Sequence, residues 1–466
     1  MSTEPGNRPW SLIIWLCLLL VLAPGAGAAE TNSLNWQTDR DLVSANMRGE
    51  TLLPLLNDIA HQTGWHVFVE PNALDHRTSV KFRDLPPGEA LHQLLGDLNY
   101  AFVPQTNGPQ QLYVFTTVMQ NATQPVNAAP VKAAAPKHVA NELIVKLKHG
   151  GNIDAIAKAL GAKVIARNDK LGLYRLQFDT AAATDAALGT LKSNSDVATV
   201  DYNYVYDPPV TPQPLANVPP GNGPVSLTLD PNTPNDPCNP IVGLIDTGVQ
   251  PLGGQLDSFL MPAVNVSGDN STLSSTMPTH GTAMAQTILR AVSQQGGNSS
   301  IRILPVNVYG NSEQATTWNI ALGVQAAVDG GATVLNMSLA GPSDSPVLSD
   351  IIQQALAKGV VVFAAAGNQP VATPNYPAAI PGVNAVTALG APGQLASYAN
   401  YGNFVEMALP GDSVIYLGNQ AYVVQGTSPA TAYASGVAAG ARANNCQPWS
   451  QIENSMATRF PVPQKK

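Results

Sequence analysis

Three short motifs that lie far apart in the chain place the strongest constraint on its fold. They read Gly-Leu-Ile-Asp246-Thr-Gly, Thr-His280-Gly-Thr-Ala-Met-Ala and Gly-Thr-Ser428-Pro-Ala-Thr-Ala. A serine hydroxyl is a weak nucleophile at neutral pH, so it needs an imidazole to take its proton and a carboxylate to orient that imidazole. A chain that uses these three side chains together must fold so that the three motifs meet.

The residues beside each motif predict the element that carries it. Residues 240–245 are apolar and partly β-branched, as in a buried parallel strand, so Asp246 lies at a carboxyl end, where α/β sheets hold catalytic groups. Small and apolar residues predict a helix after His280, and residues 430–443 predict another that begins at Ser428, where helix N–H groups favour an oxyanion. Taken singly, the motifs also fit a turn-capping Asp, a core or surface His and an N-cap Ser.

Only one imidazole is available to these motifs. The chain has seven histidines, and His280 alone lies beyond residue 150. The others are His61, His66, His76, His92, His138 and His149. If this segment is a hydrolase, its general base is therefore His280.

The order Asp, His, Ser along the chain is that of subtilisin, and it differs from the orders in chymotrypsin and in α/β-hydrolases. From about Pro240 to Asn445 the sequence resembles the subtilisin-like serine peptidases. The resemblance implies an α/β fold with a parallel sheet and helices on both faces. It also implies an endopeptidase in which Ser428 forms an acyl-enzyme, His280 transfers the proton and Asp246 orients His280.

The same resemblance implies further site residues. Asn368, after an apolar run and a glycine, matches the Asn that donates its side-chain amide to the oxyanion; by itself it also fits a turn. Edges that pair with an extended peptide substrate are expected at Ser338, Leu339, Ala340, Gly341 and Gly367. Because these segments contain no acidic cluster, we expect a small or apolar substrate side chain at the cleavage position.

The sequence departs from the family pattern near the nucleophile. Pro429 stands where Met is usual, Ala432 where Pro is usual, and Ala340 where Gly is frequent. Proline is tolerated in a first helical turn, but it lacks an N–H near the oxyanion site. Two other functions therefore stay open, namely a catalytically weak or inactive binding protein of the cell envelope, and a regulatory protease that selects one partner.

Composition narrows the classes of cofactor and partner. The net charge is −8 with no long basic run, which argues against nucleic acid and against an anionic membrane surface as partners. Triad chemistry requires no metal and no organic cofactor. Calcium is a common structural ion in the family, but no Asp-rich loop assigns a site here. The expected partner in catalysis is a peptide or protein substrate.

The first 28 residues have the layout of a signal peptide. Arg8 precedes an apolar run, residues 10–22, and then small residues up to Ala28. The run is shorter than the roughly 20 residues of a membrane span, so we expect cleavage and export to the periplasm or the medium, with a retained anchor as the alternative. Cys238 and Cys446 are then the only cysteines left, and they predict a disulfide remote from the active site, or else two free thiols.

The remaining chain predicts two small domains before the peptidase domain, residues 237–460. Residues 29–118 have a βαββαββ pattern that resembles the short N-terminal domain of secretins and TonB-dependent receptors, which implies docking to an envelope protein; a generic accessory domain is the alternative. An Ala/Pro linker, residues 119–137, follows.

Residues 138–208 have the βαββαβ order of a ferredoxin-type unit and resemble the propeptides of the family. The resemblance implies a folding chaperone and inhibitor whose C-terminal tail lies along the substrate cleft. Residues 209–236, rich in Pro, Asn and Gly, form a second linker that is long enough to be cut. The expected protein is a precursor that activates itself by cleavage.

Overall fold

The computed structural model describes most of the chain between residues 32 and 463. The described residues are 32–38, 40–103, 110–117, 119, 122, 124–126, 136–207, 209–215, 238–269, 273–274, 276–295, 300–390, 394–396 and 398–463. The predicted signal peptide lies outside them, as do most residues of the two predicted linkers. Within the described ranges, no helix combines the length and the apolar character needed to cross a membrane.

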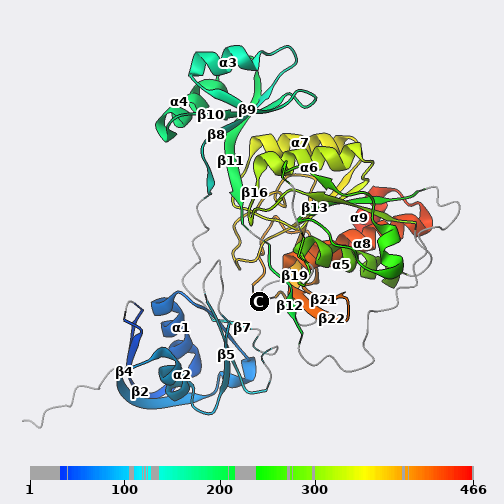
Figure 1. Cartoon of the computed structure of the whole chain (residues 1–466). Coiled ribbons are helices and arrows are strands. Elements are labelled where there is room, and N and C mark those ends of the chain that lie inside the picture. The colour runs from blue at the N-terminus through cyan, green and yellow to red at the C-terminus, as the bar shows by residue number, and fades with distance from the viewer. Residues whose placement is uncertain are drawn as a thin grey trace, which may run out of the picture.

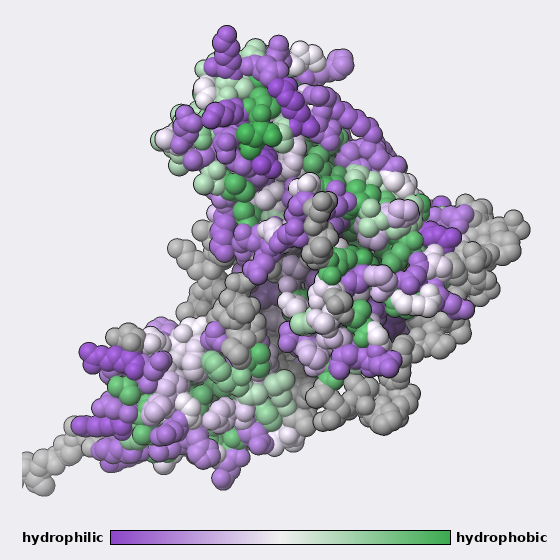
Figure 2. Space-filling model, in the orientation of Figure 1, coloured by the Kyte–Doolittle hydropathy of each residue, from purple (hydrophilic) through white to green (hydrophobic). Residues whose placement is uncertain are grey.

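Two sheets and two helices form the first domain (Figure 1). One sheet has the order β1-β2-β4 and comprises β1 (Ser33–Gln37), β2 (Leu42–Thr51) and β4 (Arg77–Leu85). The other has the order β5-β6-β3-β7 and comprises β5 (Asn99–Val103), β6 (Gln111–Phe115), β3 (His66–Val69) and β7 (Gln124–Pro125). The helices are α1 (Leu52–Thr63) and α2 (Pro87–Leu95). The leucines at helical spacing are buried as predicted, namely Leu52, Leu55 and Leu56 in α1 and Leu91, Leu94 and Leu95 in α2. Figure 2 shows mostly hydrophilic residues on the visible surface of this domain.

The first domain continues past residue 118, where its sequence pattern ends. Strand β7 pairs with β3, and the N–H of Val126 donates to the carbonyl of Val67 at 2.9 Å. Val126 is 4% exposed and belongs to the core of this domain. A two-residue strand is too short to show apolar alternation, so the sequence pattern marked it as linker.

The second domain has the predicted βαββαβ order. Its elements are β8 (His138–Leu147), α3 (Ile153–Leu160), β9 (Lys163–Asn168), β10 (Leu173–Gln177), α4 (Ala181–Lys192) and β11 (Val197–Tyr206). The strands form an antiparallel sheet whose side chains Leu143, Val145 and Leu176 pack with α3 and α4. The opposite face turns toward the third domain.

A parallel sheet of seven strands organises the third domain, with the order β14-β15-β13-β17-β18-β19-β20. The strands are β14 (Val264–Asn265), β15 (Arg302–Asn307), β13 (Ile241–Asp246), β17 (Val334–Met337), β18 (Val361–Ala365), β19 (Asn384–Leu389) and β20 (Met407–Pro410). One face packs against α5 (His280–Gln294) and α8 (Thr427–Asn445), the other against α6 (Thr317–Asp329) and α7 (Pro346–Ala357). This confirms the predicted α/β fold with helices on both faces.

The second domain sits on α6 and α7, and its last strand joins the third domain (Figure 1). Strand β11 pairs antiparallel with β16 (Ala315–Thr316), so that Tyr206 lies opposite Ala315. Tyr206 is 1% exposed, and a Cβ placed on Gly341 would lie 3.0 Å from its ring. Further along, β12 (Gln213–Pro214) pairs with β22 (Gln420–Gln425), which leads to Ser428.

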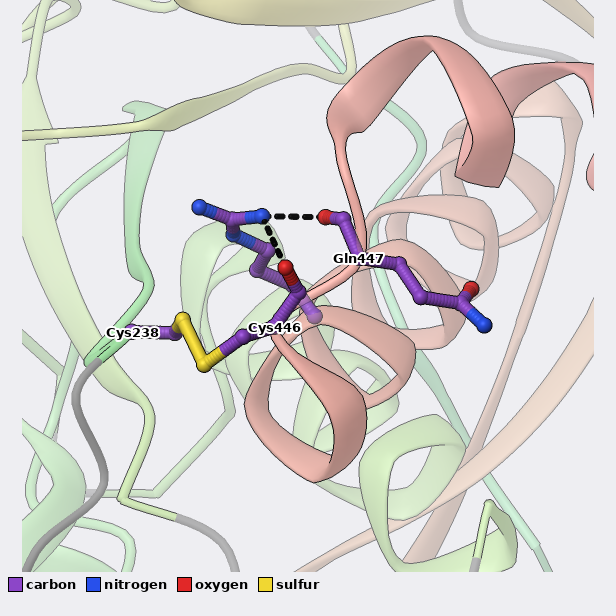
Figure 3. The surroundings of a disulfide bond; sticks show 4 residues. Cys238, Cys446 and Gln447 are labelled. Carbon is purple, nitrogen blue, oxygen red and sulfur yellow. Dashed lines mark hydrogen bonds between the residues drawn. A yellow bond between two sulfur atoms is a disulfide. The ribbon is translucent and has the colours of Figure 1, made fainter.

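A disulfide bond joins Cys238 and Cys446, with 5.6 Å between their Cα atoms (Figure 3). It ties the segment before β13 to the residue that ends α8. The guanidinium of Arg442 donates to the carbonyls of Cys446 and Gln447, which secures the same corner. Both cysteines lie at the opposite ends of their elements from Asp246 and Ser428.

Loss of this disulfide is expected to lower stability. The bond spans a sequence separation of 208 residues, so Cys446→Ser should reduce the free energy of unfolding by about 2–4 kcal/mol. Thermal unfolding followed by circular dichroism should show the lower Tm. Cys238→Ser is the matched control and should unfold at the same temperature as Cys446→Ser. Two single variants with the Tm of the oxidised wild type would contradict the prediction.

Candidate active site

Asp246 and His280 form a buried hydrogen-bonded pair. Asp246 ends β13 and His280 begins α5; they are 1% and 4% exposed. Nδ1 of His280 lies 2.8 Å and 2.9 Å from the two carboxylate oxygens of Asp246. A carboxylate only accepts hydrogen bonds, so Nδ1 carries the proton and Nε2 of the neutral imidazole is left as a base. The N–H of Thr247 donates to Asp246 Oδ1 at 2.7 Å and fixes the carboxylate.

Ser428 lies at the start of α8, in its first turn, and is 5% exposed. Its hydroxyl donates to the carbonyl of Ser338 at 3.1 Å, while the buried Nε2 of His280 has no hydrogen-bond partner among the described residues. Ser338 follows β17, the strand next to β13, so the motif that holds Ser428 and the strand end at Asp246 share one edge of the sheet. Hydrogen bonds between catalytic groups are often formed only once substrate is bound.

Asn368 lies after the next strand, β18, and its amide has a defined orientation. Its Oδ1 accepts from the N–H of Thr427 at 2.8 Å and from the Thr427 hydroxyl at 3.1 Å. Because a backbone N–H can only donate, the Nδ2 group is the one left to bind an oxyanion. Gly426 has φ 149°, and a Cβ there would lie 3.1 Å from this Nδ2, so the close approach favours glycine.

The predicted peptide-binding residues lie next to the segments that carry Ser428 and Asn368. Ser338, Leu339, Ala340 and Gly341 directly follow β17, and Gly341 exchanges two backbone hydrogen bonds with Tyr376, at 2.9 Å and 2.7 Å. The backbone of Gly367 is engaged as well, because its N–H donates to the Thr427 hydroxyl and its carbonyl accepts from the N–H of Asn400. Gly367 therefore supports the Ser428 motif, and its N–H is not free to pair with a peptide.

Ser338 has a second role that sequence reasoning missed. Its hydroxyl donates to the carbonyl of Ser428 at 3.0 Å and accepts from the amide of Asn336 at 2.9 Å. Asn336 is fully buried and also accepts from Ser435 of α8. A polar residue within the apolar strand Val-Leu-Asn-Met is the one sequence signal that pointed to this network.

Among the described residues, no cluster of three or more His, Cys, Asp or Glu side chains could hold a metal ion.

A parallel sheet with helices on both faces, a buried Asp–His pair at a strand end, and a Ser in the first turn of a helix at the same edge of the sheet define a serine hydrolase of the subtilisin type. Residues 238–458 match the subtilase family, and residues 124–203 match the fervidolysin N-terminal prodomain. The chain belongs to the subtilase family. It is a serine endopeptidase with a prodomain, which confirms the likeness of the second domain to the family's propeptides.

Named relatives agree with this assignment. A thermophilic serine proteinase of Bacillus sp. strain AK1 is 29% identical over 67% of this chain and 80% of its own length. Subtilisin Savinase of Lederbergia lenta is 31% identical over 46% of this chain and 79% of its own length. The crystal structure of fervidolysin from Fervidobacterium pennivorans shares the fold, with a TM-score of 0.55 and 18% identity, over 72% of this chain and 63% of that one. The resemblance of the first domain to secretin and TonB-type modules stays a prediction.

Proposed function

We propose that Asp246, His280 and Ser428 form the catalytic triad of an exported endopeptidase that is made as an inactive precursor. The observation that carries the proposal is the double contact of His280 Nδ1 with the buried Asp246 carboxylate, which leaves Nε2 as an unpaired buried base. Ser428 is tied to the neighbouring strand end through Ser338. An imidazole held in this way is prepared to take a proton from a serine hydroxyl.

The reaction follows from these positions. Ser428 Oγ attacks the peptide carbonyl while its proton moves to His280 Nε2, and the oxyanion binds the amide of Asn368 and the N–H of Ser428. The proton then passes to the leaving amine, which breaks the peptide bond and leaves an acyl-enzyme. A water molecule attacks the ester, again with His280 as base, and releases Ser428. These steps use only groups of this chain and one water molecule.

One local movement precedes the attack. The Ser428 hydroxyl must leave the carbonyl of Ser338, 3.1 Å away, and turn to His280. A neutral hydrogen bond contributes only about 0.5–1.5 kcal/mol, so this rotation adds little to a typical catalytic barrier. Pro429, the next residue of α8, supplies no N–H, so the oxyanion depends on Asn368 and Ser428.

The prodomain is proposed to inhibit the precursor. Strand β11 already occupies the β16 edge, and Tyr206 is buried against Gly341 of the predicted peptide-binding segment. A substrate is expected to bind at that segment, so the buried end of the prodomain and the substrate would compete for the space beside Gly341. Cleavage in the second linker, with export through the predicted signal peptide, would produce the mature enzyme in the periplasm or the medium. The disulfide bond supports export, because such bonds persist in oxidising compartments.

The first domain is proposed to dock to an envelope protein, as its resemblance to secretin-type modules implies. If it selects substrates, removal of residues 30–126 should impair cleavage of the natural partner and leave hydrolysis of a short peptide unchanged. Loss of both activities would point to a folding role for this domain.

An active-site fluorophosphonate probe tests the proposed function. The secreted protein is treated with the probe, digested and analysed by mass spectrometry, which also reports the mature N-terminus. We expect labelling at Ser428 and cleavage of casein once the prodomain has been removed. A folded, matured protein that is neither labelled nor able to cleave casein would instead support the inactive binding protein.

The hold of the prodomain should weaken as the pH rises. Two ion pairs lie at its sheet face against α6 and α7, Lys146 with Asp350 of α7 and Arg175 with Glu142. The same face carries one more acid, Asp201. Asp201 is 6% exposed, and its Oδ2 has no hydrogen-bond partner. Burial raises the pKa of Asp201. Hydrogen bonds from the N–H of Tyr202, at 2.8 Å, and from the side chains of Tyr204 and Ser345 oppose the rise, as does the charge of Lys192, but burial outweighs them. The other groups that face this site are Tyr206 and Asp344.

A raised pKa in the docked state means that docking favours the protonated carboxyl. The contribution is complete below the ordinary pKa of a free Asp, about 3.9, and is lost as the pH rises through the raised value. The full chain is incubated at pH values from 5 to 8, and the release of the prodomain over time is measured by gel electrophoresis. Release should be faster at the higher pH. Asp201→Asn should slow release at pH 8 and flatten the profile, while exposed Asp179→Asn should behave as wild type. Equal profiles for Asp201→Asn and wild type would contradict this.

A further inference from the structure

We propose that Gln250 is a positioning residue for catalysis, because its side-chain amide holds the start of α5, and with it the imidazole of His280, against the strand end at Asp246. Gln250 lies four residues after Asp246 and is 4% exposed. The proposal rests on the proposed role of His280 as the general base. Gln250 touches neither His280 nor Ser428, so it would act through the segment that leads to His280.

Every hydrogen-bonding position of the Gln250 amide is used on that segment. Oε1 accepts from the N–H of Thr279 at 2.8 Å and from the hydroxyl of Thr282 at 2.8 Å. Nε2 donates to the carbonyl of Met277 at 2.8 Å and also to the carbonyl of Ser274. A glutamine side chain offers two donors and two acceptor positions, and all four are satisfied by residues on either side of His280.

Backbone contacts complete the link between the two catalytic segments. The N–H of Gln250 donates to the Thr282 hydroxyl at 2.8 Å, and the Thr279 hydroxyl donates to the carbonyl of Gly248 at 2.7 Å. On the other side of the Asp–His pair, the N–H of Gly281 donates to the Thr247 hydroxyl at 2.8 Å. Residues that follow Asp246 are thus hydrogen-bonded to residues on both sides of His280.

The contacts that position the segment before His280 are different from those that hold helix α5 in place. Helix α5 packs along α8 so closely that a Cβ on Gly436 would lie 2.4 Å from the carbonyl of Ile288. This packing of α5 against α8 does not involve Gln250. Helix α5 should therefore stay folded and in place when the Gln250 amide is removed. The chain just before His280 would lose three hydrogen bonds, because Thr279, Met277 and Ser274 each bond to the Gln250 amide, and it would keep the bond from the Thr279 hydroxyl to Gly248.

Catalysis is sensitive to such a loss. A misplacement of about 1 Å in a catalytic group costs up to about 100-fold in rate, and supporting hydrogen bonds normally keep such groups within roughly 0.5 Å. We therefore expect kcat to fall while KM stays nearly constant, since the peptide-binding edge at Ser338 and Gly341 does not contact Gln250.

The chemistry also explains why an amide is needed. In Gln250→Glu, an ionised carboxylate could still accept from Thr279 and Thr282, but it would face the carbonyl oxygens of Met277 and Ser274 with no proton to donate. Protonation returns one donor. The activity of this variant relative to wild type should therefore be highest at acid pH and fall as the new carboxyl ionises, a signature that a simple loss of stability would not produce.

The test expresses Gln250→Met, Gln250→Glu and wild type as full-length chains and compares the enzymes that mature from them on a fluorogenic peptide. We expect kcat of Gln250→Met to be about 10- to 100-fold lower, with KM within twofold and Ser428 still labelled by a fluorophosphonate, only more slowly. Gln250→Glu should show the falling activity ratio from pH 5 to 8. Gln286→Met is the matched control. Gln286 is buried like Gln250, but it lies within α5, and its amide forms hydrogen bonds with the backbone of Tyr416 and not with the segment before His280.

The outcomes are distinguishable. If Gln250→Met keeps kcat within twofold of wild type, or if it and Gln286→Met lose activity equally and in step with their Tm, Gln250 is only a structural residue and the proposal is wrong. If wild type itself is neither labelled nor active after maturation, the proposed function fails instead. A flat pH ratio for Gln250→Glu would likewise overturn the role of the donated hydrogen bonds.

Discussion

Replacing Ser428 by alanine is expected to lower kcat by a factor on the order of 10⁶, because loss of the proposed nucleophile would remove the benefit of the whole proposed triad. The residual rate should come from substrate binding and the oxyanion site. Hydrolysis of casein and of a fluorogenic peptide by purified protein measures the effect. The lost hydroxyl makes one hydrogen bond, to Ser338 at 3.1 Å, so the fold should persist with a nearly unchanged Tm.

The same variant tests self-activation. If the precursor cuts its own second linker, Ser428→Ala should accumulate as an uncut chain with the prodomain attached, and added wild-type enzyme should process it. Ser258→Ala, an exposed serine of the same domain, is the control and should mature normally. Full activity in Ser428→Ala would show that another residue is the nucleophile.

Replacing Asn368 by alanine should lower kcat by about 100- to 1000-fold with little change in KM, as expected for loss of one oxyanion donor. The structure adds a complication, because Asn368 Oδ1 also holds the N–H and hydroxyl of Thr427, next to Ser428. Asn368→Ala removes both functions together. Asn368→Asp separates them, since it keeps an acceptor for Thr427 and loses the donor.

We expect Asn368→Asp to be at least as impaired as Asn368→Ala, because its negative charge would face the developing oxyanion. Comparison of kcat and KM on one fluorogenic peptide decides the matter. Recovery of Asn368→Asp to within tenfold of wild type would mean that Asn368 acts by holding Thr427, and that the oxyanion is stabilised elsewhere. Thermal unfolding of both variants provides the control for stability.

Much of the fold was predictable because its signals are local. The apolar run 240–245 forms β13, since a strand that is buried on both faces of a parallel sheet needs apolar residues. The small and apolar residues after His280 form α5, which packs against that sheet. Helix α8 begins at Thr427, one residue before the start predicted at Ser428, and its Ala-rich part follows as expected. The order of the three motifs was enough to predict the class of enzyme.

Other parts of the site could not be predicted because their partners are distant in sequence. Gln250 follows Asp246 without any motif, yet its amide bonds to residues 24 to 32 positions further on. Asp201 lies in β11, where apolar and polar residues alternate in the usual way for a strand. It is buried because that face of the sheet packs against α6 and α7, which the sequence does not reveal. Gly367 had the right neighbours for a substrate contact, but its N–H bonds to Thr427.

The sequence by itself determined the parallel-sheet class, the residues able to perform serine chemistry and the division into prodomain and catalytic domain, since each depends on residue types within a short window. Only the tertiary structure decided which polar groups meet. It closed Asp246 on His280, turned Ser428 toward Ser338, placed Tyr206 against Gly341 and surrounded the Gln250 amide with four partners. Hydrogen bonds act over about 3 Å, so their partners are chosen by the final packing of segments that lie far apart along the chain.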